Sequence, residues 1–286
     1  SILRSVLEDD EEIKPLAFVG SMKIEDGVDE IAKAITETAS FSLKKFQEQR
    51  NQNDAFAYVR NLIENIGVYI ILMGDLGNHQ SSFDLELFRG FSISDELAPL
   101  IVINNKDSKA AWTFTLFHEL THIWLGQTGI SGYNAEQKTE MFCNKVASKI
   151  LLPDDDPFFK QFDEGINFEE QIESISNFAQ LKNVSSSMVA YKLFTLGIIS
   201  QSAWYELRNE FRKFWFETKD KEKEKIREKG RGPNFYVLRR SYLGENLLSQ
   251  VYYFLRSGSL SSVKASKILG LNPKQIQNLY QTKNFS

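Results

Sequence analysis

The chain has 286 residues, of which 42% are hydrophobic and 25% are charged, and its formal net charge is −4. This length and composition fit a globular protein with a sizeable core, built as one large domain or as two to three small ones. The net negative charge gives no overall basic field that would attract nucleic acid. A single cysteine excludes an internal disulfide framework and fits a reducing, cytoplasmic compartment. No apolar run is long enough to span a membrane.

The first part of the chain predicts an irregular lead-in followed by two helices. Residues 1–28 are acidic and lack the apolar segment of a signal peptide. Residues 28–41 have apolar side chains at helical spacing and acids in the predicted first turn, where the helix dipole favours them. A second helix is predicted over residues 53–66, with Gly67 as its stop. Its N-cap is predicted to be one of two residues, Asn53 or Asp54.

Three short segments then predict a small β-sheet. Residues 68–73 and 100–103 are apolar and rich in β-branched side chains, and residues 84–91 alternate roughly between apolar and polar. Together with the helices, these segments predict an α+β fold that is mostly helical and holds a small sheet. An edge strand of such a sheet could take an extended peptide by strand addition.

The next predicted helix carries the motif on which the functional interpretation depends. Residues 112–126 read W-T-F-T-L-F-H-E-L-T-H-I-W-L-G and predict a buried helix that stops at Gly126. His118 and His122 are four residues apart, so they lie on one face of the helix and can hold one zinc ion. Glu119 lies beside the first histidine, where it can act on a water molecule rather than bind the metal. The H-E-x-x-H letters alone also fit two histidines of an ordinary core.

A carboxylate on the following helix favours the metal site over that alternative. Residues 133–152 predict an amphipathic helix with Glu140 near its middle and Glu136 one turn earlier. Such a third ligand completes a site of two histidines and one carboxylate that leaves a fourth position for water. We predict that Glu140 is the ligand, and Glu136 is its rival.

For five further residues, the sequence leaves a choice between a supporting role at the site and an ordinary structural role. Asn144 lies one turn after the predicted third ligand and can accept a hydrogen bond from a ligating imidazole, or be a plain polar helix residue. Cys143 is predicted to be a small buried hydrophobe rather than a ligand. His79 is a candidate for stabilising the oxyanion or binding substrate, Tyr133 is a further candidate oxyanion donor, and Arg89 is a candidate peptide anchor. The alternatives are a solvated loop residue for His79 and a simple ion pair for Arg89.

Residues 167–197 predict two short helices joined near residues 183–185, in the shape of a helix-turn-helix. Ala179 is small at the predicted packing point, and Ser185 is the predicted cap of the second helix. Residues 150–185 contain eight acids and two lysines, and phosphate contacts need cations. A packing or protein-recognition module is therefore favoured over DNA binding for this pair.

The last third of the chain predicts a long helix and a small helical end unit. Residues 204–231 mix both signs of charge, which is typical of a solvated helix face. Glycines 230 and 232 and Pro233 break this helix. Residues 235–286 predict a small helical end unit, for which another helix-turn-helix is one option. Asn272 is a predicted cap, and Pro273 lies at a first helical position.

Two of these segments resemble the paired signature of the ImmA/IrrE family of metallopeptidases. They are F-T-L-F-H-E-L-T-H-I-W-L-G and E-M-F-C-N-K-V-A-S-K-I-L-L-P. The resemblance covers residues 15 to about 160 and includes four upstream segments: P-L-A-F-V-G-S (15–21), L-G-N-H (76–79), F-R-G-F (88–91) and A-P-L-I-V-I-N (98–104). It implies a zincin-like fold in which Glu140 is the third zinc ligand and Glu119 the catalytic base. Relatives of this branch often carry an extra N-terminal segment, and the first residue here is not methionine.

The sequence therefore predicts a peptidase domain over residues 1–160, a helix-turn-helix-like module over 161–202 and a helical unit over 203–286. The expected activity is that of an endopeptidase with one Zn²⁺ per chain, for which Mn²⁺ is an alternative in the cell. The resemblance implies a protein substrate, a helix-turn-helix repressor of stress or mobile-element genes. The alternative is a regulatory module that binds DNA or a protein partner and has a structural or inactive zinc site.

Overall fold

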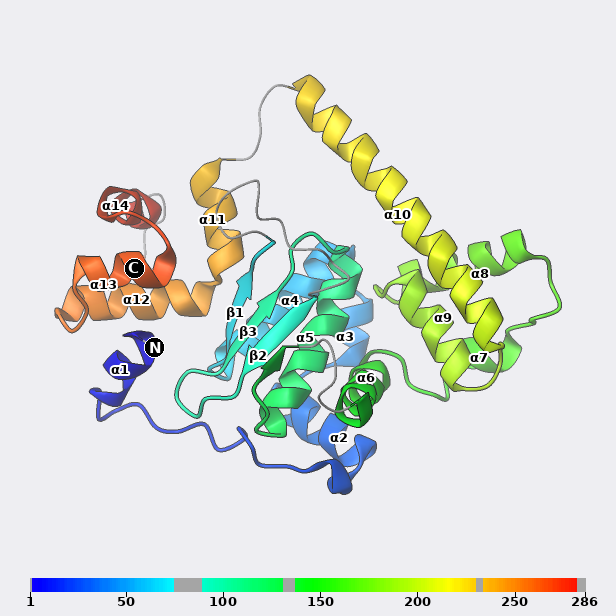
Figure 1. Cartoon of the computed structure of the whole chain (residues 1–286), viewed down its shortest axis with the longest axis horizontal. Coiled ribbons are helices and arrows are strands. Elements are labelled where there is room, and N and C mark those ends of the chain that lie inside the picture. The colour runs from blue at the N-terminus through cyan, green and yellow to red at the C-terminus, as the bar shows by residue number, and fades with distance from the viewer. Residues whose placement is uncertain (1, 75–88, 131–136, 230–233, 282–286) are drawn as a thin grey trace.

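A four-stranded sheet lies at the centre of the computed structural model, which describes residues 2–74, 89–130, 137–229 and 234–281 (Figure 1). The strands are β1 (Tyr69–Leu72), β2 (Gly90–Ile93), β3 (Leu100–Ile103) and β4 (Gly129–Ile130). Their order is β1-β3-β2-β4, with β1 parallel to β3 and with β2 antiparallel to both β3 and β4. The strands predicted over 68–73 and 100–103 are confirmed, and β2 begins near the end of the alternating segment, whose residues 84–88 lie outside the described ranges.

Side chains alternate between two cores on the two faces of this sheet. Ile70 and Leu72 of β1 point into a first core, whereas Tyr69 and Ile71 pack against a second one. The alternation follows from the two-residue period of a strand. Since both faces of β1 are covered, its run of four apolar residues is explained by burial on both sides.

The first core lies between the sheet and a layer of N-terminal and central helices. These are α2 (Val28–Thr38), α3 (Leu43–Gln47), α4 (Gln52–Asn65), α5 (Lys109–Trp124) and α6 (Gln137–Leu151). Helix α5 packs against α4, α6, β2 and β3, which explains why it is apolar around most of its circumference. Gly126 follows α5 with a φ of 67°, so the predicted helix stop is confirmed.

Two expectations for the N-terminal region are wrong. Residues 2–8 form the helix α1 (Ile2–Glu8) rather than an irregular lead-in, because Leu3, Val6 and Leu7 are buried in the second core. A short 3-10 helix, η1 (Ile24–Asp26), follows later in this region. Helix α4 begins one residue earlier than predicted, and its cap is Asn51, whose side chain accepts hydrogen bonds from the backbone N–H groups of Asn53 and Asp54.

The predicted helix-turn-helix shape over residues 167–197 is present and packs on the first core. After α7 (Pro157–Gln161), it consists of α8 (Phe168–Leu181) and α9 (Ser186–Thr195), with Ser185 as the cap of α9. Between them, Asn183 has a φ of 57°, and its side-chain amide donates to the backbone carbonyls of Phe46 and Gln49. The turn is therefore fixed against the end of α3, on the first core.

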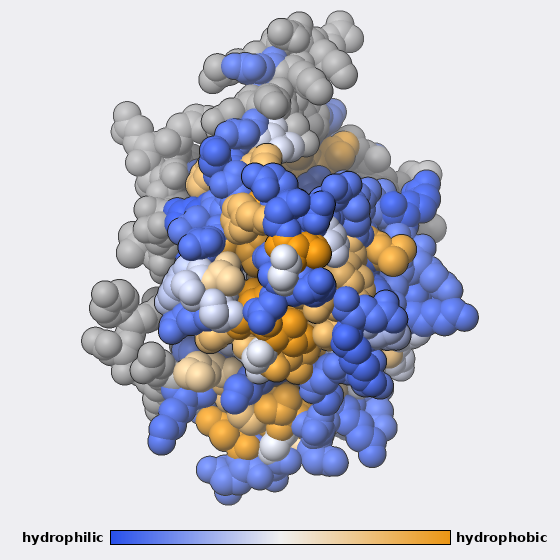
Figure 2. Space-filling model, turned by 90° about the vertical axis from the view of Figure 1, so that its right-hand side faces the viewer, coloured by the Kyte–Doolittle hydropathy of each residue, from blue (hydrophilic) through white to orange (hydrophobic). Residues whose placement is uncertain are grey.

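The long helix α10 (Gln201–Lys229) packs on α9 at its start and extends well beyond it (Figure 1). Figure 2 shows the side of the molecule on which α8, α9 and α10 lie, at the right of Figure 1, where apolar residues gather within a polar surround. The large hydrophobic side chains exposed on α8, the end of α9 and α10 are Leu181, Leu196, Tyr205, Phe214 and Phe216.

The last four helices form a separate layer on the other face of β1. They are α11 (Phe235–Leu243), α12 (Glu245–Ser257), α13 (Ser262–Leu269) and α14 (Pro273–Gln281), and they build the second core together with α1. The predicted domain boundaries at residues 160 and 202 stay predictions, because shared packing does not say which segments fold alone. Within the described ranges, no helix is both long and apolar enough to cross a membrane.

A buried ion pair joins the two layers. Arg60 on α4 pairs with Glu64 at 2.9 Å and also donates to the backbone carbonyls of Ile70 and Ser241. Glu64 in turn accepts from the backbone N–H of Glu245 at 3.1 Å. Because Arg60 bonds to the backbone of β1 and α11 and Glu64 to the backbone of α12, the pair fixes α11 and α12 against the sheet.

Candidate metal centre

The two histidines of α5 point into one buried space. Ser108 caps this helix, and its side chain accepts from the N–H of Ala111. The Nε2 atoms of His118 and His122 are 3.2 Å apart, and both residues are buried. The four-residue spacing therefore places both imidazoles on one face of the helix, as the sequence predicts.

Glu140 of α6 brings a carboxylate to the same space. Its two oxygens lie 3.1 Å from Nε2 of His118 and 3.3 Å from Nε2 of His122. Zinc bound tetrahedrally by nitrogen and oxygen at about 2.0–2.2 Å requires ligand atoms roughly 3.3–3.5 Å apart. The three side chains therefore fit such an ion with little rearrangement, and they are the group of potential metal ligands found within the described ranges.

Asn144 lies where it can orient the first histidine. Its Oδ1 is 2.9 Å from Nδ1 of His118. Since an amide oxygen can only accept, Nδ1 carries the proton and Nε2 keeps its lone pair for a metal. The predicted contact is present.

The electrostatics of the group favour a positive charge among the three ligands. Burial opposes charge on His122, but the neighbouring Cys143 and Glu140 outweigh it and raise its pKa to about 10. Burial also acts on Glu140, yet His118 and His122 lower its pKa to about 2. A carboxylate that stays ionised between two imidazoles attracts a cation, whether a proton or a metal ion.

Cys143 is fully buried, and burial raises the pKa of its thiol. A thiol that resists ionisation is a poor metal ligand, because the thiolate is the form that binds. This agrees with the predicted role of a small buried hydrophobe.

Glu119 is completely buried beside the ligands and is held by the sheet. Its Oε2 accepts a hydrogen bond of 3.0 Å from the hydroxyl of Ser92 on β2. Strand β2 approaches α5 closely at Gly90, where an added Cβ would lie 2.6 Å from the Thr115 side chain and 3.0 Å from Oε1 of Glu119. Glycine at this position therefore lets the strand reach the carboxylate.

Ser92 and Gly90 are the site residues that sequence analysis missed. The segment F-R-G-F was noted only as part of the family resemblance, and no local pattern shows which face of a strand meets a helix. Ser94 further anchors the end of α5, since its hydroxyl donates to the backbone carbonyls of His122 and Gln127 at 3.3 and 2.8 Å. Alternate residues of β2 thus contact the metal-site helix.

Of the remaining candidates, Arg89 lies within the described residues and is not brought into this group. Arg89 is exposed just before β2, and its backbone carbonyl accepts from the N–H of Asn104. His79, Tyr133 and the rival ligand Glu136 lie outside the described residues. Their predicted roles stay predictions.

A helix with two histidines, a neighbouring carboxylate and a third ligand from the next helix defines a metallopeptidase-type site. Residues 66–194 match the model of the Peptidase_M78 family, described as the IrrE N-terminal-like domain. The matched segment contains the sheet, α5, α6 and the α8–α9 pair. No curated protein and no solved structure matched the chain.

Proposed function

We propose that the protein is a zinc-dependent endopeptidase. The observation that carries this proposal is the convergence of two imidazole nitrogens and one carboxylate within about 3.3 Å of each other, beside a buried second carboxylate. A purely structural zinc site needs no such base, and it usually closes with a fourth protein ligand. Three ligands leave one coordination position for reactants.

The ligands in this proposal are His118, His122 and Glu140. When bound, zinc would polarise a peptide carbonyl and lower the pKa of a nearby water. Two imidazoles and one carboxylate are a common zinc donor set, although Mn²⁺ also accepts imidazole and carboxylate, so metal analysis of protein from its native cells decides the ion.

Glu119 is the proposed general base. Its carboxylate accepts a proton from the attacking water and delivers it to the leaving amine. The hydrogen bond from Ser92 fixes one oxygen of this carboxylate. Burial keeps bulk water away from this proton transfer.

An extended substrate segment would pair with the sheet near this base. Strand β4 is the terminal strand beside β2 within the described residues, and β2 carries Ser92. Strand addition supplies backbone hydrogen bonds without regard to sequence. Selectivity would then come from side-chain contacts around the metal.

Asn144 is a positioning residue in this proposal. We expect Asn144→Ala to weaken zinc binding about 10–100-fold, because the His118 ring loses the partner that fixes its orientation and tautomer. Competition with a fluorescent zinc chelator would measure the change. Asn144→Asp, which keeps an acceptor at the same place, is expected to retain wild-type affinity or exceed it. Equal affinity of wild type and Asn144→Ala would remove Asn144 from the site.

The proposed substrate is a helix-turn-helix transcriptional repressor, whose cleavage would switch on stress or mobile-element genes. This part of the proposal rests on the resemblance to the ImmA/IrrE family. We expect wild-type protein, incubated with a lysate of its native cells, to create new N-termini within such a repressor. Labelling of N-terminal amines followed by mass spectrometry would identify them.

Protein with Glu119→Gln is the control for that experiment, since it keeps the fold and the metal ligands. N-termini that appear with both proteins would belong to a contaminating protease. New N-termini seen with wild type alone, but only in proteins other than repressors, would retain the peptidase and overturn the substrate.

A further inference from the structure

The C-terminal layer contains a compact helix-turn-helix that the proposed peptidase activity does not use. Helices α13 and α14 are joined by only three residues, Gly270, Leu271 and Asn272. Gly270 takes the left-handed conformation with a φ of 61°, and Asn272 caps α14 by accepting from the N–H of Gln275. A turn of this length that contains glycine is typical of the DNA-binding motif.

Helix α14 is held rigidly on its inner side. Ile276 and Leu279 are buried in the second core, and the Tyr280 hydroxyl donates to the carbonyl of Leu248 on α12. Two arginines of α11 cap the pair, since Arg239 donates to the carbonyl of Leu269 and Arg240 to that of Leu279. Cations at these C-terminal carbonyls complement both helix dipoles.

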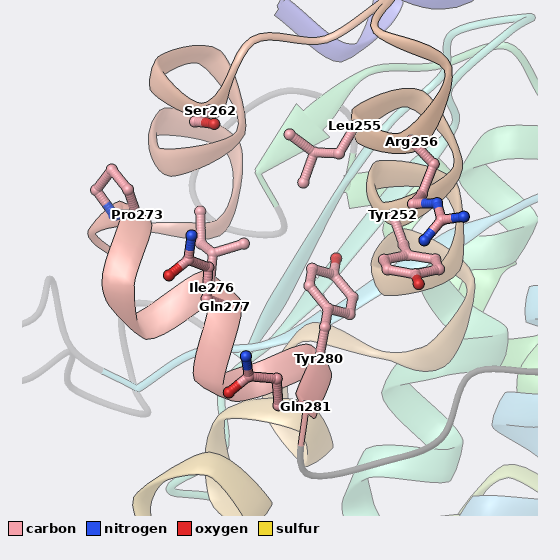
Figure 3. A pocket seen from close by; sticks show the side chains of 9 residues that line it. All are labelled: Tyr252, Leu255, Arg256, Ser262, Pro273, Ile276, Gln277, Tyr280 and Gln281. Carbon is pink, nitrogen blue, oxygen red and sulfur yellow. The ribbon is translucent and has the colours of Figure 1, made fainter.

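The outer side of α14 is polar and exposed. Lys274, Gln277 and Gln281 follow one another at helical spacing, and all three are exposed. Figure 3 shows Gln277 and Gln281 on α14, across a groove of about 450 Å³ from Tyr252 and Arg256 of α12. Rigid support behind an exposed stripe of long polar side chains is what a groove-reading helix requires.

The charge of this layer differs from that of the rest of the chain. Residues 246–286 contain five lysines and arginines and no aspartate or glutamate, whereas the whole chain has a net charge of −4. Lys264 and Lys267 of α13, Lys274 of α14 and Arg256 of α12 are exposed. The acid-rich segment before α9 has the opposite character, so the C-terminal pair offers more cations for phosphates than the α8–α9 pair does.

We propose that this layer binds double-stranded DNA, with α14 in the major groove. Lys264, Lys267 and Arg256 would contact backbone phosphates, which position the protein without reading sequence. Gln277 and Gln281 would face base edges, where glutamine pairs well with adenine, and Lys274 suits guanine. This binding function is separate from the peptidase site.

The test is fluorescence anisotropy of full-length protein with a labelled pool of random duplexes over about 50–200 mM salt. We expect salt-dependent binding by wild type. Replacing Lys264, Lys267 and Lys274 together by alanine should weaken binding at least about tenfold. The slope of log K against log salt should become less steep by roughly two units, since two of these lysines contact phosphates and each such contact contributes about 0.9.

The matched control replaces three lysines that are exposed elsewhere, Lys33, Lys44 and Lys45, by alanine. It removes the same charge, and we expect wild-type binding and slope. The double variant Gln277→Ala/Gln281→Ala should retain binding to the random pool. The duplexes that it enriches from this pool should show a weaker sequence preference than those enriched by wild type. Circular dichroism would verify that each variant is folded.

Two results would overturn the proposal. If wild type binds no duplex at the lowest salt, the α14 face does not bind DNA, and a protein becomes the favoured partner for it. Equal loss of binding in the two triple-lysine variants would show a general effect of charge rather than a site on α13 and α14.

Discussion

Protein with Glu140→Ala is expected to lose its zinc, whereas wild type holds about one ion per chain. The carboxylate of Glu140 lies within 3.3 Å of both imidazole nitrogens, so its removal deletes one of three ligands and the negative charge that attracts the cation. Two neutral imidazoles on one helix do not complete a zinc site on their own. Elemental analysis of protein dialysed against zinc-free buffer would measure the loss, which we expect to exceed about nine-tenths of the metal.

The rival ligand supplies the matched control for this experiment. Glu136→Ala removes the same kind of side chain one helical turn earlier in the sequence, and we expect it to retain the wild-type zinc content. Zinc retained by Glu140→Ala and lost by Glu136→Ala would exchange the two assignments. Absence of zinc from wild type, even after refolding with the ion, would favour the alternative of an interaction protein without a functional metal.

The convergence of the three candidate ligands could be predicted because the information that places them is local. His118 and His122 need only one helix, and Glu140 needs only the next helix to pack against it, as α6 does on α5. Helical spacing supplies the first relation, and the amphipathic pattern of residues 137–151 supplies the second. The burial of the two histidines follows from the apolar flanks of α5.

The support for Glu119 could not be predicted in the same way. Ser92 reaches it across 27 positions of sequence, and its hydroxyl points towards α5 only because β2 pairs with β3 in the observed register. A shift of one residue would turn Ser92 to the opposite face. Strand pattern predicts that a sheet exists, but the register depends on the tertiary structure.

Helix α1 shows a further limit of local patterns. Seven residues are too few for a stable isolated helix, so a segment of this length predicts an irregular chain. In the structure, Leu3, Val6 and Leu7 are buried among residues of the second core that lie more than two hundred positions later. Tertiary burial stabilises what propensity does not.

Protein with Glu119→Gln is expected to keep its zinc and to lose about 10²–10⁴-fold in cleavage rate. Glutamine has nearly the shape of glutamate and can still accept the hydrogen bond from Ser92, but its amide cannot take a proton from water. Zinc content is preserved because Glu119 is not one of the three ligands. The rate would be followed on the protein substrate found by N-terminal labelling, at equal metal loading.

The Ser92→Ala variant separates proton transfer from packing in the same assay. It leaves the carboxylate in place but removes the donor that fixes one of its oxygens, so we expect a smaller loss of rate than in Glu119→Gln and an unchanged zinc content. A dead Glu119→Gln beside a partly active Ser92→Ala assigns the proton transfer to the Glu119 carboxylate. Cleavage by Glu119→Gln at the wild-type rate would instead show that another group takes the proton, and the proposed base would be wrong.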